Sequence, residues 1–354
     1  MTKKVENIVV GISVGDLNGI GSEVVLKTFE DARMLELCTP VIFANVKMLS
    51  FIKKTFDLTA MLHGIDSLDQ IVTGKINVIN VWKENVEINL GVSDANNGKY
   101  AVMSFTTAVK ALKEDLIDAL VTAPISKINI QSEDFKFPGH TDYLDQELEG
   151  NALMFMIQDN LKVGLLTDHI PVTDVASHLT EALLREKIET VRKSLVQDFS
   201  INKPKIAVLG LNPHAGDGGV IGKEDELILK PVIKKMFANG TMVFGPYPAD
   251  GFFGSGQYEK FDAVIAAYHD QGLIPFKTLS FGKGVNYTAG LNKVRTSPDH
   301  GTAYDIAGKG IADYNSFKEA VYAAIDIYNS RVQYEQISKN PLKIKEKHLE
   351  SKKG

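Results

Sequence analysis

The interpretation of this sequence rests on residues 264–310, which read VIAAYHDQGLIPFKTLSFGKGVNYTAGLNKVRTSPDHGTAYDIAGKG. It begins with an apolar run, Val264 to Ala267, that is typical of a buried strand. Polar residues of several chemical kinds follow the run: His269, Lys277, Asn286, Arg295 and His300. Open α/β sheets bind their ligands just beyond the carboxyl ends of strands. We therefore expect this stretch to form one wall of a functional site.

Short apolar runs alternate with helical patterns along the rest of the chain, and this alternation predicts a mainly parallel α/β sheet. Strands are expected at 8–14, 41–44, 76–81, 118–124, 206–209 and 264–267, and an antiparallel hairpin at 152–157 and 163–167. Helices are expected from near Ser22, over about 99–114, over 142–148 and over about 175–199.

The loop from Gly15 to Gly21 leads from the first expected strand into the first expected helix. Such a loop can bind an anion through free backbone N–H groups, or it can be a plain strand-to-helix turn. Its glycines stand at positions 15, 19 and 21, which is not the G-x-G-x-x-G spacing of a dinucleotide-binding fingerprint.

Composition narrows the class of protein. At 354 residues the chain can hold one large domain or two ordinary ones. Its net charge of -5 argues against nucleic acid or an anionic membrane surface as the main partner. A lone cysteine, Cys38, excludes an internal disulfide framework and fits a reducing compartment. With no apolar run near the roughly 18 residues of a membrane span and no signal-peptide pattern, we expect a cytoplasmic protein.

Three histidines share one context, because His169, His214 and His269 each come at or just past the end of an expected strand. In a parallel sheet such ends share one edge, so the three side chains can converge. Three imidazoles with an open fourth position are a pattern of catalytic divalent-metal sites. Three unrelated polar histidines in loops are the competing interpretation. His63, His178 and His348 lie in polar surroundings and are expected at the surface.

His140 and Thr141 are expected at the N-terminus of the helix over 142–148. A threonine there is explained by helix capping, whereas a histidine has no such structural explanation. His140 is therefore the stronger candidate for a binding role.

Several linked motifs resemble those of the 4-hydroxythreonine-4-phosphate dehydrogenase family of pyridoxal phosphate biosynthesis. They are Thr122–Lys127, Gly139–Asp142, Asn212–Gly216, Gly245–Asp250, His269–Leu273 and Arg295–Thr302. The resemblance runs from the Gly15 loop to Gly310, although the family's usual prolines are replaced at Leu17 and Asn292. It implies an isocitrate/isopropylmalate dehydrogenase-like fold of two α/β/α domains with the active site in the cleft between them. Residues 1–125 plus 271–354 would form the cofactor-side domain, and 126–270 an inserted middle domain with metal ligands and dimer contacts.

The resemblance also implies a role for individual residues. The metal ligands would be His169, His214 and His269, binding one divalent ion (zinc, magnesium or cobalt). The substrate would be bound by His140, Thr141, Lys277, Asn286 and Arg295, and Lys277 is also a candidate proton carrier. Residues 300–312 are similar to the adenosine-side loop of the wider superfamily, so NAD would contact His300, Gly301, Thr302 and Ala303. The family is a homodimer whose sites are shared between subunits.

The activity implied is oxidation of 4-phosphohydroxy-L-threonine by NAD to a β-keto acid, which loses carbon dioxide to give 3-amino-2-oxopropyl phosphate. A divalent ion would act as a Lewis acid on the alcohol. Within the family, threonate or erythronate 4-phosphate is the alternative substrate. A metal-dependent hydrolase or lyase would use the same histidines without a nucleotide, and a non-catalytic binding protein would leave the histidines and cations without a common purpose.

Overall fold

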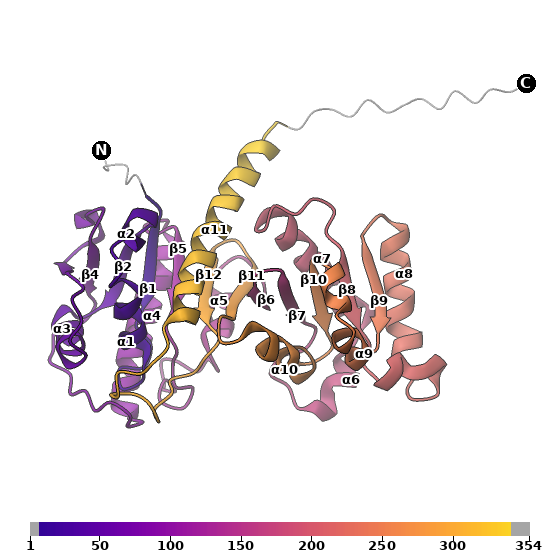
Figure 1. The fold of residues 1–354 in the computed structure, drawn as a ribbon, viewed down its shortest axis with the longest axis horizontal. Coiled ribbons are helices and arrows are strands. Elements are labelled where there is room, and N and C mark those ends of the chain that lie inside the picture. The colour runs from indigo at the N-terminus through magenta and orange to yellow at the C-terminus, as the bar shows by residue number, and fades with distance from the viewer. Residues whose placement is uncertain (1–6, 341–354) are drawn as a thin grey trace, which may run out of the picture.

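A mixed sheet of 12 strands runs through residues 7–340, the part of the chain that the computed structural model describes (Figure 1). Its strand order is β3-β4-β2-β1-β5-β12-β11-β6-β7-β10-β8-β9. The strands are β1 (Val9–Ser13), β2 (Thr39–Ala44), β3 (Leu62–Ile65), β4 (Ile76–Asn80), β5 (Ala119–Thr122), β6 (Gly150–Gln158), β7 (Leu161–Leu165), β8 (Ile206–Leu209), β9 (Val243–Tyr247), β10 (Ala263–Ala266), β11 (Val285–Leu291) and β12 (Val294–Pro298).

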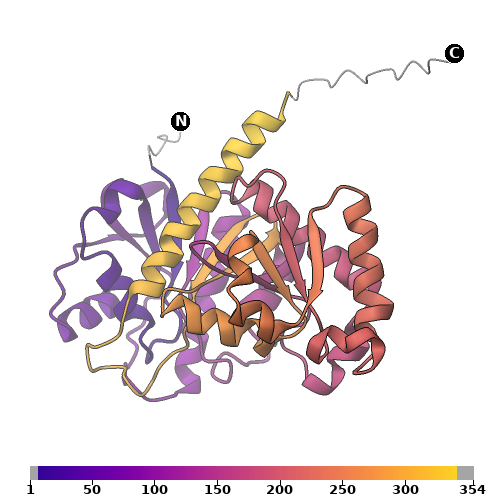
Figure 2. The same cartoon turned by 45° about the vertical axis from the view of Figure 1, so that its right-hand side comes forward.

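Helices cover both faces of the sheet (Figures 1 and 2). They are α1 (Gly21–Thr28), α2 (Met34–Leu37), α3 (Val46–Thr55), α4 (Ala95–Lys113), α5 (His140–Glu147), α6 (Val175–His178), α7 (Glu181–Gln197), α8 (Lys230–Ala238), α9 (Ala249–Gly254), α10 (His269–Ser280) and α11 (Asn315–Ser338). No helix within residues 7–340 is both long enough and apolar enough to cross a membrane.

Two parallel blocks make up the sheet, and β11 lies where they meet. Strands β1 to β5 and β12 run parallel to one another, as do β7, β10, β8 and β9. β11 pairs antiparallel with both β12 and β6, and β6 pairs antiparallel with β7. The predicted α/β class and the predicted hairpin are therefore confirmed. The division into residues 1–125 plus 271–354 and 126–270 stays a prediction.

Local sequence explains most element boundaries. The apolar runs of β1 and β8 are buried along their whole length. The Asn45 side chain caps α3. The Asp94 side chain caps α4, which begins four residues before the expected helix start. The single helix expected over 175–199 is wrong, because the chain breaks it at Thr180. The Thr180 hydroxyl accepts a hydrogen bond from the Leu183 amide at 3.2 Å and begins a new helix, α7.

The stretch from 264 to 310 is more regular than the sequence indicates. His269 is the first residue of α10, and Lys277 lies within the same helix. Asn286 and Arg295 lie on β11 and β12, so they project from strands and not from a loop after a strand. The unexpected strands β3 and β9 form the two edges of the sheet, where strands are short and tolerate the glycine and proline of the β9 sequence VFGPY.

The hydrophobic core is continuous on one face of the sheet and divided on the other. One large cluster packs α1, α3, α11, α7 and α8 against a single face. The opposite face carries two separate clusters, one under α4 and α5 and the other under α9 and α10. A gap in the apolar packing between two clusters is a natural place for a polar site.

A buried ionic network joins α7, β11 and α11. The Asp198 carboxylate accepts hydrogen bonds from the hydroxyls of Ser194 and Tyr287 at 2.5 and 2.6 Å. Arg331 donates from Nε to Asp198 at 2.6 Å and from Nη2 to the Tyr287 hydroxyl oxygen at 2.7 Å. Burial raises the pKa of Tyr287 well above its usual value, so its hydroxyl keeps the proton that it donates.

Arg331→Met is expected to lower the free energy of unfolding by about 3–5 kcal/mol, because it leaves the Asp198 carboxylate buried without its cation. Arg33→Met is the control, since the ion pair of Arg33 with Asp31 is exposed and such surface pairs contribute little to stability. Urea unfolding of both variants tests this. An Arg331→Met protein within 1 kcal/mol of the parent would show that the network contributes little.

Candidate active site

A cavity of about 230 Å³ opens on the divided face of the sheet. Its walls come from both sides of the gap, because Ile125 packs against the α4–α5 cluster and Met154 belongs to the α9–α10 cluster. The structure brings together here seven of the residues expected in the site: His140, Thr141, His169, Asn286, Arg295, His300 and Gly301. Residues from five separate segments of the chain therefore meet in one polar hollow.

Arg295 is a buried cation at this cavity, with 2% of its surface exposed. Its guanidinium donates to the hydroxyls of Thr122 and Thr288 and to His140 Nδ1 at 2.5 to 3.1 Å. All of these partners are neutral, and no carboxylate among residues 7–340 forms an ion pair with it. Burial lowers the pKa of Arg295 to about 9, so the group is still charged at neutral pH. A buried cation without a counter-ion is an anion-binding group.

His140 is held in one tautomer by Arg295. A guanidinium only donates hydrogen bonds, so the His140 Nδ1 atom that it contacts at 3.0 Å must be the acceptor. The ring proton is then on Nε2, which is buried and has no partner within the described residues. Burial, with the nearby charges of Arg295 and Lys127, lowers the pKa of His140 well below its usual value. A neutral imidazole thus presents an N–H donor at the cavity.

His300 is held in the opposite tautomer. Its Nδ1 lies 3.0 Å from the backbone oxygen of Gly301, and because a carbonyl only accepts, Nδ1 carries the proton. Nε2 is then a lone-pair acceptor, buried and unpartnered in the described chain, as is Asn286 Oδ1. Burial lowers the pKa of His300. The residues that line the cavity therefore include a cation, an N–H donor and two acceptors.

Thr141 and Lys277 are placed differently from one another. Thr141 lines the cavity at the start of α5, whose N-cap is Gly139, so capping does not explain the threonine. Lys277 does not line the cavity. Its half-exposed ammonium group pairs with Asp299 Oδ1 at 3.1 Å, and Asp299 precedes His300 in the chain. The substrate-binding and proton-carrier roles of Lys277 stay predictions.

The three histidines expected to bind metal follow three neighbouring strands, since β7, β10 and β8 are adjacent and parallel. The rings of His169 and His269 lie 5.7 Å apart. His214 lies in a turn of left-handed residues after β8. Nowhere in residues 7–340 do three or more His, Cys, Asp or Glu side chains form a group that could hold a metal ion. The structure places two expected ligands side by side and leaves the third apart.

His169 and His269 fit a divalent metal chemically. His269 Nδ1 lies 2.7 Å from Asp270 Oδ1, and a carboxylate on one ring nitrogen commonly orients the other toward a metal. Burial, followed by the charge of Lys127, lowers the pKa of His169. A neutral ring is the form that binds a metal.

The segment expected to bind NAD packs against the Gly15–Gly21 loop. The Ile20 amide donates to the Thr302 oxygen at 3.0 Å, and a Cβ on Gly19 would lie 2.8 Å from that oxygen. The amides of Asp16, Asn18 and Gly19 also donate within the protein. The loop is therefore a strand-to-helix turn that supports Thr302.

Sequence reasoning missed Thr122, Thr288 and Lys127 as parts of the site. The two threonine hydroxyls hold the guanidinium of Arg295, and Lys127 lines the cavity as a second cation. Thr122 and Lys127 are the first and last residues of one quoted motif, which was the available signal. Thr288 carries no signal, because only its pairing on β11 brings it near β12.

Known proteins resemble this chain over most of its length. Residues 36–324 match the family described as pyridoxal phosphate biosynthetic protein PdxA. The chain belongs to this family. The 4-hydroxythreonine-4-phosphate dehydrogenase of Bacteroides thetaiotaomicron is 47% identical over 94% of this chain and 92% of its own length. A candidate D-threonate 4-phosphate dehydrogenase of Oceanobacillus iheyensis is 34% identical over 90% of this chain and 97% of its own length.

A solved structure shows the same fold. The 4-hydroxythreonine-4-phosphate dehydrogenase of Klebsiella pneumoniae superposes with a TM-score of 0.79 at 31% identity, covering 92% of this chain and 99% of that one. The predicted 4-hydroxythreonine-4-phosphate dehydrogenase family and its isocitrate/isopropylmalate dehydrogenase-like fold are confirmed, and so is the prediction of an enzyme.

Proposed function

We propose that this PdxA-family chain is an NAD-dependent, divalent-metal-dependent 4-hydroxythreonine-4-phosphate dehydrogenase. It would oxidise 4-phosphohydroxy-L-threonine to a β-keto acid that decarboxylates to 3-amino-2-oxopropyl phosphate. The observation that carries the proposal is the uncompensated buried guanidinium of Arg295 in a cavity of about 230 Å³. That site is built for a small molecule with a strongly anionic group.

The phosphate of the substrate would bind where Arg295 meets the start of α5. Gly139, His140 and Thr141 all line the cavity there, and the N-terminus of a helix offers backbone N–H groups and a favourable dipole to an anion. His140 Nε2–H adds a donor from a neutral ring, and Lys127 adds a second positive charge. Because these donors are fixed by packing and by Thr122 and Thr288, the phosphate anchors the substrate in one orientation.

The remaining polar groups would act on the other end of the substrate. Asn286 Oδ1 would accept from the substrate's amine, and His300 Nε2 would accept from a hydroxyl or a water. When bound, a divalent ion at His169 and His269 would acidify the alcohol, and NAD at His300 to Ala303 would accept the hydride. Lys277, paired with Asp299, is the candidate to carry the proton.

A homodimer with shared sites belongs to the same proposal. Two of the three expected metal ligands lie together within one chain, so a partner subunit would supply the third histidine. The cofactor-side domain (1–125 plus 271–354), the inserted middle domain (126–270) and a cytoplasmic location are parts of this proposal too. The metal would be zinc, magnesium or cobalt.

Threonate 4-phosphate is the second candidate substrate, supported by the name of the Oceanobacillus iheyensis relative. It would use the same phosphate contacts and differ where the amine is bound. Reduction of NAD, followed at 340 nm with each phosphate in parallel, separates the two. We expect kcat/KM to favour 4-phosphohydroxy-L-threonine by at least about tenfold, the effect of one mispaired polar group. A preference for threonate 4-phosphate would reassign the substrate, and no NAD reduction with either would reject a dehydrogenase.

A further inference from the structure

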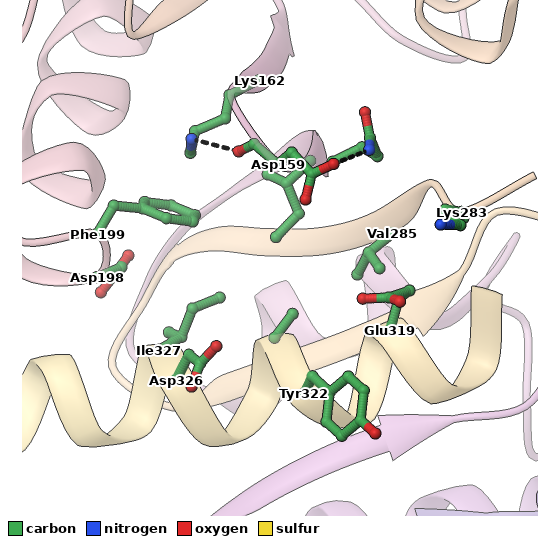
Figure 3. A pocket seen from close by; sticks show the side chains of 13 residues that line it. Asp159, Lys162, Asp198, Phe199, Lys283, Val285, Glu319, Tyr322, Asp326 and Ile327 are labelled. Atoms are coloured by element: carbon green, nitrogen blue, oxygen red, sulfur yellow. Dashed lines mark hydrogen bonds between the residues drawn. The ribbon is translucent and has the colours of Figure 1, made fainter. Parts of the chain in front are cut away.

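A second cavity, of about 280 Å³, lies between α11, the β6–β7 turn and the residue after α7 (Figure 3). It is on the opposite face of the sheet from the active-site cavity. Val285 lines the second cavity, whereas Asn286, the next residue of β11, lines the active site. On β6, Ile157 lines the second cavity and Met154 lines the active-site cavity. The two cavities are therefore separate, and they lie on opposite faces of the same two strands, β6 and β11.

One wall of this cavity carries a buried ammonium group. Lys162 has 8% of its surface exposed, and its Nζ donates to the backbone oxygen of Asp159 at 3.0 Å and lies 5.0 Å from the centre of the Phe199 ring. No carboxylate in residues 7–340 pairs with it. An ammonium group has three protons to donate, so it can receive an anion from the cavity.

The facing wall carries carboxylates on one side of α11. Glu319 and Asp326 are seven residues apart, two helical turns, so they lie on the same side of the helix. Neither forms a hydrogen bond or ion pair with any other described residue. The other two carboxylates that line the cavity are already engaged, Asp159 by the Gln158 amide and Asp198 by Arg331. Figure 3 shows the Lys162 ammonium group and the Glu319 and Asp326 carboxylates on opposite sides of the hollow.

Apolar and aromatic side chains also line the cavity. They include Ile157, Phe199, Val285, Tyr322 and Ile327. Lys283, which is exposed, is a second cation that lines the cavity. A simple cation would meet the charges of the two lysines, and a simple anion would meet the two carboxylates. A molecule with both charges, separated by a short carbon chain, can place its anionic group at Lys162 and its cationic group at the carboxylates.

We propose that this cavity is a second binding site, distinct from the active site, for a small zwitterion with an anionic group and a primary amine. The anionic group, a phosphate or a carboxylate, contacts Lys162. The amine contacts Asp326, Glu319 adds a second negative charge on the same side of α11, and the carbon chain lies against Phe199 and Tyr322. The site does not depend on the proposed dehydrogenase activity.

Calorimetric titration with 2-aminoethyl phosphate tests the site in the Arg295→Met variant, in which the active-site cavity has lost its main anion-binding group. We expect one bound molecule per chain, and binding at least about tenfold weaker after Asp326→Asn with Glu319→Gln, the effect of losing one charged hydrogen bond. Lys162→Met should weaken binding equally. Glu335→Gln is the matched control, because Glu335 is exposed on α11 and does not line the cavity. 4-Aminobutanoate in place of the phosphate shows which anionic group is preferred.

Inorganic phosphate and ethylamine are the single-charge probes, and each should bind at least about tenfold more weakly than 2-aminoethyl phosphate. The proposal is overturned if no binding remains in Arg295→Met, or if the α11 substitutions change nothing. It is also overturned if inorganic phosphate binds as tightly as the zwitterion. The α11 substitutions are at the surface, so this result does not depend on a destabilised protein.

Discussion

Arg295→Met is expected to lower kcat/KM for 4-phosphohydroxy-L-threonine by about 10- to 10²-fold. Four of the five guanidinium N–H groups already donate to Thr122, Thr288 and His140, so within residues 7–340 one is left for the phosphate. The estimate follows from that one charged hydrogen bond, worth about 1.5–3 kcal/mol, at about 1.4 kcal/mol per tenfold change. His140 would also lose the donor that fixes its tautomer, so the N–H presented by Nε2 would no longer be assured. Steady-state kinetics with NAD and a saturating divalent ion measure the effect.

The same substitution is expected to leave the protein at least as stable as the parent. Arg295 is a buried charge without a counter-ion, and replacing such a group with an apolar side chain of similar length is often neutral or stabilising. Arg331→Met makes the opposite prediction, because it breaks an ion pair. A large loss of activity with an unchanged melting temperature would identify Arg295 as a binding group. Arg192→Met, at an exposed pair with Glu189 on α7, should change neither property.

His269→Ala is expected to lower metal-dependent turnover by more than about 100-fold, since even residues that only support a metal ligand contribute about 10–100-fold. Folding should change little, because the His269 side chain is 37% exposed. Bound metal, measured by elemental analysis after dialysis, should fall in parallel with activity, and His214→Ala should behave in the same way.

His178→Ala is the control for the histidine series, because His178 is an exposed histidine of α6 that does not line the cavity. It should keep both the metal and the activity of the parent. Near-normal turnover of His269→Ala in metal-depleted buffer would show that the three-histidine assignment is wrong.

The sequence predicts most of the fold because its buried strands are plain apolar runs. β1, β8 and β10 are recognisable for this reason. β11 and β12 are not, because Asn286, Thr288 and Arg295 interrupt their apolar pattern. Asn286 and Arg295 line the cavity, and Thr288 accepts a hydrogen bond from Arg295. The polar residues of the site therefore obscure the strand pattern in the sequence.

Some residues of the site are predictable from the sequence and others are not. Motif resemblance predicts His140, Asn286 and Arg295, and the structure brings all three to one cavity. It assigns no role to Thr122 or Thr288, whose importance depends on the pairing of β12 with β5 and β11. The tautomer of His140 also depends on its contact with Arg295, which no local pattern encodes. Spatial relations between distant strands are what the sequence alone leaves open.

The most direct test of the phosphate site is a kinetic cycle with two substrates and two proteins. kcat/KM is measured for 4-phosphohydroxy-L-threonine and for 4-hydroxy-L-threonine, with the parent protein and with Arg295→Met. Removal of the phosphate should lower the kcat/KM of the parent by about 10²- to 10⁴-fold. The same removal should lower the kcat/KM of the variant by a factor at least about ten times smaller, because the two changes remove one shared interaction. Equal losses in both proteins, or equal rates on both substrates, would contradict the assignment of Arg295 to the phosphate.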